Sequence, residues 1–165
     1  MRYSPVALSL SLLFAVSASG IYAGEERGDP RAIALATQGR AELESGETQA
    51  AIDAFEAALA VDPSYSPLYV DLADAARAEG LQGKAIRFYR EAQERDPKNI
   101  AAISGEGEAL LARGAVEKAR ANLARLEDLC GGDCAETRQL AAAIANGPRI
   151  LSAEAGSTER PVSQN

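Results

Sequence analysis

The chain of 165 residues contains no histidine and no tryptophan, a single methionine and only two cysteines. Without histidine, it lacks the commonest general base and the commonest metal ligand. Ser-His-Asp and Cys-His nucleophile systems are therefore excluded, as are zinc sites with a His ligand. Aromatic residues make up only 5% of the chain. A core of this composition must be built mainly from Ala, Leu and Ile.

Basic residues are also in the minority, with 17 Lys and Arg against 24 Asp and Glu and a net charge of −7. The sequence has no basic face, which argues against nucleic-acid binding. It also has no Gly-rich phosphate loop and no calcium-loop pattern, so we expect no metal and no cofactor. Glu106 and Glu108 are at i and i+2 on a predicted helix and diverge by about 200°. We expect them on a solvated helix face, not in a catalytic pair.

The first 23 residues have the layout of a secretory signal peptide. Arg2 provides a positive start, residues 6–18 form an uncharged apolar run, and an acidic stretch begins soon after Ala23. Cleavage is expected after Ala23, with Ala18 as the alternative. The rival interpretation is an uncleaved membrane anchor, but the run is shorter than the roughly 20 apolar residues that a spanning helix needs.

The middle of the chain repeats with a period of 34 residues. The period relates a glycine column, an alanine column, a column of large apolar residues and two Asp-Pro pairs. The columns are Gly46, Gly80 and Gly114; Ala51, Ala85 and Ala119; and Phe55, Tyr89 and Leu123. Three units result, over residues 30–63, 64–97 and 98–131.

Each unit has the pattern of two helices. Asp29, Ser66 and Asn99 are predicted N-caps of the first helices, and the glycine column suits a left-handed residue after each of them. The Ala and large apolar columns form a stripe on each second helix. Because one helix pair cannot bury its apolar face alone, the units are expected to stack into a solenoid.

These residues resemble the tetratricopeptide repeat, a helix–turn–helix unit of 34 residues. In the second unit the matching residues are Tyr69, Leu72, Ala73, Gly80, Ala85, Tyr89, Ala92 and Pro97. The chain departs from the pattern by lacking Trp and by placing Gln38 and Glu106 where Leu is usual. The resemblance implies an all-α fold, a right-handed superhelical solenoid of three such units plus a C-terminal capping helix.

The two cysteines lie where the third unit ends. Asp133 and Glu136 have the spacing of a capping box, which predicts a capping helix over 134–145. In an exported chain, Cys130 and Cys134 favour a structural disulfide that holds this helix to the third unit. The alternatives are a reactive thiol pair, because Cys134 lies at a helix N-terminus, and free thiols or a soft-metal site.

The resemblance also implies a concave groove, lined by the first helices, that binds a protein or peptide partner without catalysis. The groove-facing positions carried over are Arg40, Leu43, Glu44, Val70, Asp74, Arg77, Ser104, Glu108 and Leu111. Partners of the kind held by a C-terminal carboxylate are not expected, because Asp74 would repel them. Arg77→Glu and Leu111→Asp are expected to be surface changes that leave stability nearly intact.

The full prediction is an exported interaction module in the periplasm of a Gram-negative bacterium. After signal cleavage we expect no membrane span. One alternative is a structural subunit of an envelope assembly that docks through convex or end surfaces. Another is a thiol–disulfide redox protein acting through Cys130 and Cys134. The predicted layout is a signal peptide (1–23), a short linker (24–29), the repeat domain (30–145) and a disordered tail (146–165).

Overall fold

The computed structural model describes residues 28–147, which form seven α-helices and no strand. The predicted signal peptide and the part of the predicted tail beyond residue 147 lie outside this range. The helices are α1 (Pro30–Glu44), α2 (Thr48–Val61), α3 (Pro67–Ala78), α4 (Gln82–Arg95), α5 (Ile100–Ala112), α6 (Val116–Cys130) and α7 (Ala135–Asn146). The last helix therefore includes Asn146, which was expected to belong to the tail.

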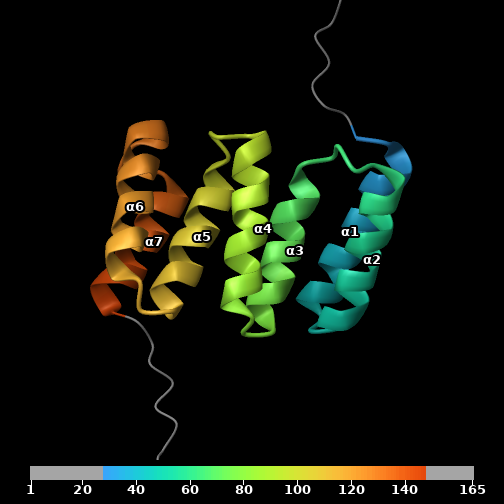
Figure 1. Ribbon diagram of the computed structural model, residues 1–165, viewed down its shortest axis with the longest axis horizontal. Coiled ribbons are helices and arrows are strands. Elements are labelled where there is room, and N and C mark those ends of the chain that lie inside the picture. The colour runs from blue at the N-terminus through green and yellow to red at the C-terminus, as the bar shows by residue number, and fades with distance from the viewer. Residues whose placement is uncertain (1–27, 148–165) are drawn as a thin grey trace, which may run out of the picture.

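The helices form three hairpins, α1–α2, α3–α4 and α5–α6, stacked in one row with α7 at the end (Figure 1). The first helices of successive hairpins lie close together: α1 contacts α3, α3 contacts α5, and α5 contacts α7. In the part of the chain that the structure describes, the second helices α2, α4 and α6 make no such approach. The row is therefore open on the side of the second helices. The predicted all-α solenoid with a capping helix is confirmed.

The glycine column ends the first helices as predicted. Gly46, Gly80 and Gly114 have φ values of +83°, +75° and +76°, in the left-handed region that residues with a Cβ avoid. Each of these glycines lets the chain reverse into the second helix within a few residues. The 34-residue period of the glycines therefore sets the spacing of the hairpins.

Two of the three predicted N-caps form. The Asp29 carboxylate accepts a hydrogen bond from the backbone N–H of Arg31 at 2.8 Å, and the Asn99 side chain accepts one from Ala102 at 2.9 Å. Ser66 precedes α3 but makes no side-chain cap hydrogen bond. Its backbone is already helical, with φ −58° and ψ −30°, whereas a capping residue needs an extended backbone to turn its side chain toward the helix end.

Large side chains lie over glycines where helices cross. A Cβ at Gly39 would lie 2.5 Å from Cε1 of Phe55, so the ring occupies the space that a side chain would take. The ring of Tyr89 covers Gly105 of the following hairpin in the same way. Phe55 and Tyr89 are both fully buried. The glycines therefore let the helices approach closely, so that a few large side chains are enough to fill the core.

The two cysteines join α6 to α7. Cys130 is the last residue of α6, Cys134 precedes α7, and their sulfur atoms are bonded with the Cα atoms 5.8 Å apart. The predicted capping box is wrong, because the N-cap is Cys134 and not Asp133, and it makes no side-chain cap hydrogen bond. The helix begins one residue later than predicted and puts Glu136 at its second position. There its carboxylate lies 3.1 Å from Sγ of Cys134 but does not bond the backbone N–H of the N-cap, as a capping box requires.

Opening the Cys130–Cys134 bond is expected to lower the free energy of unfolding by about 2 kcal/mol, since the short loop limits the entropic gain. Denaturant unfolding of the wild type with and without reductant measures this, and a Cys130→Ser, Cys134→Ser variant should be insensitive to reductant.

A structural bond should also have a reduction potential below about −300 mV. A higher potential together with activity in insulin reduction would favour the redox alternative.

Gly105→Ala is expected to destabilise the domain by about 1–3 kcal/mol, because the new Cβ would overlap the buried ring of Tyr89. Gly83→Ala is the matched control, because it is also a helical glycine and its Cβ would meet only the end of the Arg113 side chain, at 3.4 Å. The control should leave stability unchanged or raise it by up to about 1 kcal/mol. Equal thermal stabilities of the two variants would contradict this account of the helix crossing.

Candidate functional site

The inner side of the row, formed by α1, α3, α5 and α7, holds most of the predicted groove residues. The structure joins several of their charged side chains to polar side chains of the neighbouring first helices. Each of these pairs joins residues 31 positions apart in the sequence. We call this set of contacts the inner ladder; it consists of Arg40–Asp71, Arg77–Glu108 and Gln139–Glu108.

The first contact of the inner ladder joins α1 to α3. Nε and Nη2 of Arg40 donate to the two carboxylate oxygens of Asp71, both at 2.8 Å, in a bidentate pair. The Arg40 side chain is 44% exposed, whereas that of Asp71 is 11% exposed. Burial raises the pKa of Asp71 although Arg40 opposes the shift. The pair therefore fixes the geometry of α1 against α3 more than it adds net stability.

The remaining contacts of the inner ladder meet at Glu108. Arg77 of α3 donates to one carboxylate oxygen of Glu108, and Nε2 of Gln139 in α7 donates to the other at 2.6 Å. Glu108 on α5 thus links both neighbouring first helices. Its side chain is 19% exposed and that of Arg77 is 31% exposed. Arg77→Glu is therefore not the simple surface change that was expected, since it would place two carboxylates together.

Asp74 has an internal partner as well. The hydroxyl of Tyr89 donates to its Oδ1, and Arg77 lies 3.9 Å from the same oxygen. Burial, followed by the charge of Asp74, raises the pKa of Tyr89, so the hydroxyl stays protonated and remains a donor. The charged groove residues Arg40, Asp74, Arg77 and Glu108 are therefore all engaged within the domain.

The remaining predicted groove residues are divided between surface and core. Leu43 and Val70 are half-buried and pack against the core, and Glu44 is exposed. Ser104 and Leu111 are buried, at 6% and 5% exposure, so they are not the exposed surface positions that were expected. The reason is that α5 lies between α3 and α7, and the capping helix occupies the position of a fourth first helix. Leu111→Asp would consequently put a charge into the core.

A cleft of about 570 Å³ lies where α7 meets α5. We call it the inner cleft; its apolar walls are Leu111, Ala112, Ala142 and Ala143. Glu108 and Gln139 of the inner ladder line it too, which places it on the inner side of the row. A pocket with apolar walls and a few polar groups is the common form of a ligand site.

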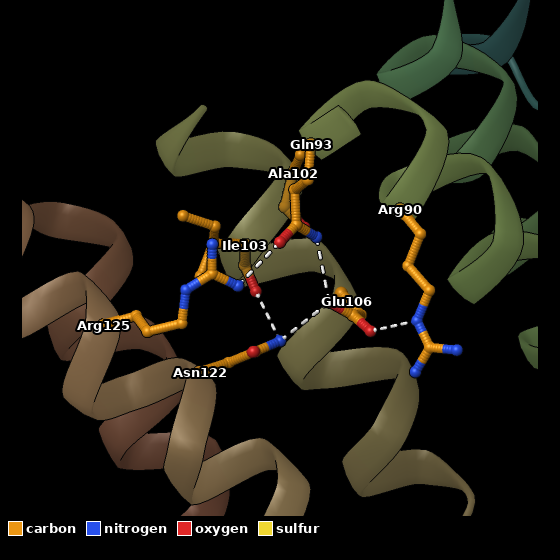
Figure 2. Close-up of polar contacts among 7 residues, drawn as sticks. All are labelled: Arg90, Gln93, Ala102, Ile103, Glu106, Asn122 and Arg125. Atoms are coloured by element: carbon orange, nitrogen blue, oxygen red, sulfur yellow. Dashed lines mark hydrogen bonds and ion pairs between the residues drawn. The ribbon is translucent and has the colours of Figure 1, made fainter. Parts of the chain in front are cut away.

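A second polar cluster lies on the opposite side, between α4, α5 and α6 (Figure 2). Glu106 is buried, with its side chain 7% exposed, and accepts hydrogen bonds from three side chains. The donors are Nε of Arg90 at 2.7 Å, Nε2 of Gln93 at 2.9 Å and Nδ2 of Asn122 at 3.2 Å. The expectation that Glu106 faces solvent was wrong, because its side of α5 faces the second helices.

The hydrogen bonds decide the charge state of Glu106. Burial alone would raise its pKa, but the bonds from Gln93, Arg90 and Asn122 outweigh burial and hold the pKa below its usual value. Glu106 is therefore an anion near neutral pH. Its contribution to stability is present above the unfolded-state pKa and is lost as the pH falls through the lower folded-state value.

Sequence reasoning missed Asp71 and Gln139 as partners of the groove charges, and Gln93 and Asn122 as partners of Glu106. A search for oppositely charged or amide-bearing residues 31 positions apart would have found the first two. Within residues 28–147, no helix is long and apolar enough to cross a membrane. The same segment contains no group of His, Cys, Asp or Glu that could hold a metal ion.

Comparisons with known proteins agree with this architecture. A family model, the tetratricopeptide repeat, matches residues 36–100. A search of curated proteins found no match. Among solved structures, the Sgt2 TPR domain from Aspergillus fumigatus is 26% identical with a TM-score of 0.65, and the match covers 72% of this chain and 80% of that one.

Two further structures contain bound peptides. The first TPR of Spaghetti (RPAP3), bound to an HSP90 peptide, is 22% identical with a TM-score of 0.63 and covers 74% of this chain and 99% of that chain. The Yersinia enterocolitica type III secretion chaperone SycD, in complex with a peptide of the translocator YopD, is 22% identical with a TM-score of 0.60, covering 69% and 86%. With the repeat, the hairpins and the family match in agreement, the described chain has the tetratricopeptide-repeat fold, and its residues 36–100 match that family.

Proposed function

We propose that this protein is a non-catalytic interaction module of the cell envelope that binds a partner peptide or helix on the inner side of the row. The inner cleft carries the proposal, because it combines apolar walls with polar groups at one end of that side. The peptide-bound state of two tetratricopeptide-repeat structures with the same fold supports a peptide as the partner.

The inner ladder refines which groups contact the partner. Arg40, Arg77 and Glu108 already hold neighbouring helices, so replacing these contacts with contacts to a partner would give little net gain. The exposed alanines of the inner cleft, Ala112 and Ala142, are free to contact a partner without breaking such an interaction. The partner is therefore expected to insert an apolar side chain between α5 and α7.

The envelope setting rests on the N-terminal sequence. Residues 1–23 combine a basic start, an uncharged apolar run and a small residue before an acidic stretch. Two cysteines placed to bond to one another suit an oxidising compartment such as the periplasm. These features support export, with cleavage of the leader, to the periplasm of a Gram-negative bacterium.

Ala142→Glu is expected to abolish partner binding, because it fills and charges the inner cleft while leaving the fold intact. Ala57→Glu is the matched control, since Ala57 is also an exposed helical alanine but lies on α2, away from the cleft. The measurement is crosslinking in intact cells from a photoreactive residue at position 112, followed by mass spectrometry. One adduct should appear in the wild type and in Ala57→Glu and disappear in Ala142→Glu. An adduct that survives Ala142→Glu would refute the inner cleft as the binding site.

The mature protein isolated from the periplasm is expected to begin at Gly24, which corresponds to cleavage after Ala23; cleavage after Ala18 would instead leave Ser19 first. N-terminal sequencing of protein expressed with its own leader checks this. A chain that retains Met1 and sediments with membranes would support the anchor instead. A chain that retains Met1 and stays in the cytosolic fraction would contradict export altogether.

A further inference from the structure

The outer side of the row contains a cleft of about 370 Å³ between α4 and α6. We call it the outer cleft. It exists because the second helices stand apart, so that α5 forms its floor through Glu106 and Leu110. No residue that lines the outer cleft also lines the inner cleft. A ligand of the outer cleft would therefore contact none of the residues that line the inner cleft.

The repeat itself provides a control for this cleft. One period earlier, the gap between α2 and α4 is apolar, because Leu72 is buried there and Leu59 and Phe88 pack against the same core. At the equivalent positions in the next gap stand Glu106, Gln93 and Asn122. Three apolar residues are thus replaced together by polar residues that hydrogen-bond one another.

Stability alone does not account for this exchange. Burying a carboxylate costs free energy that hydrogen bonds only offset, and well-packed apolar residues commonly match or exceed a buried polar network in stability. The apolar set is compatible with this backbone, as the preceding gap demonstrates. We therefore infer that the polar residues Gln93, Glu106 and Asn122 serve a requirement other than stability of the fold.

The charges at the rim of the outer cleft also differ from those at the preceding gap. Arg90, Lys118 and Arg125 line the outer cleft, whereas Glu106 is its one acidic residue. One period before Arg90 and Arg125, the sequence has Glu56 and Glu91. The outer cleft is therefore a cationic site in a chain with a net charge of −7.

Two of the three cationic side chains have hydrogen-bond donors that are free to contact a ligand. Glu106 binds Arg90 through Nε only, and the two terminal nitrogens of Arg90 have no partner among residues 28–147 (Figure 2). Lys118 is exposed, and its side-chain ammonium has no hydrogen-bond partner in the same range. Arg125 is held by Oε1 of Gln93 at 2.8 Å. Glu106 thus acts as a positioning residue that fixes Arg90 with its outer nitrogens available.

From this geometry we propose that the outer cleft binds a carboxylate side chain of an acidic peptide segment, with Arg90 and Lys118 as the direct contacts. A guanidinium with two free terminal nitrogens matches the two oxygens of a carboxylate. Arg125, together with Gln93, closes the cleft on the α6 side. The site would give the module a second surface for an acidic region of the same or another protein.

The experiment is an NMR titration of the full mature chain with a synthetic peptide that has Glu at alternate positions and blocked ends. The reporters are the Nε–H signal of Arg90 and the side-chain amide signals of Gln93 and Asn122, which should shift together. The same peptide with Gln in place of Glu should not shift them, and added salt should weaken the shifts. Inorganic phosphate at equal ionic strength is the third probe.

Lys118→Glu is expected to weaken binding of the Glu peptide by about tenfold or more, the effect of losing one charged hydrogen bond. Lys84→Glu is the matched control, because Lys84 is the equivalent residue one period earlier, beside the apolar gap, and changes the net charge equally. The control should change affinity by no more than about twofold. Equal losses in the two variants would show that binding follows overall charge, which would overturn the proposal.

A second variant tests the floor. Gln93→Leu, Glu106→Leu and Asn122→Phe together restore the apolar set of the preceding gap, and this variant should be at least as thermally stable as the wild type while losing the peptide. A folded triple variant that binds with wild-type affinity would overturn the proposal. So would phosphate shifting the same signals with the affinity of the Glu peptide, since the cleft would then be a site for any anion.

Discussion

The packing of Tyr89 onto Gly105 is the contact on which the rest of the domain depends. The ring is fully buried and lies where a side chain of the next hairpin would otherwise stand. Its hydroxyl also lies over Gly105 and donates to Asp74 on the first helix of its own hairpin. One side chain thus fixes the spacing within the second unit and the spacing between the second and third units. A solenoid is stable only through such contacts between neighbours.

Close approach of the first helices and separation of the second helices are two consequences of one geometry. On the inner side, α1, α3, α5 and α7 are near enough for the inner ladder to form, and its charges are used in holding them. On the outer side, α4 and α6 are bridged only by long side chains such as Arg125 and Gln93. The inner side therefore offers a cleft with apolar walls, whereas the outer side offers a cationic one.

The sequence was sufficient to predict features set within one repeat. The glycine column, the caps at Asp29 and Asn99 and the helical hairpins follow from local conformational preference and periodicity. Contacts between units were not predictable in this way, because the 31-residue spacing of the inner ladder depends on how the hairpins pack. The burial of Glu106 was missed for the same reason: a helical position was judged by its charge, without knowledge of which neighbour it faces.

The capping helix shows how an end of the row becomes a site. Leu140 packs over Gly107, Gln139 bonds to Glu108, and the cysteine pair joins α7 to α6. These three restraints hold α7 in the place of a fourth first helix, yet no further second helix follows it within the described residues. The inner cleft is bounded by α5 and α7 alone and is already formed without a partner. A preformed cleft does not require ordering on binding, so more of the contact energy remains available as affinity.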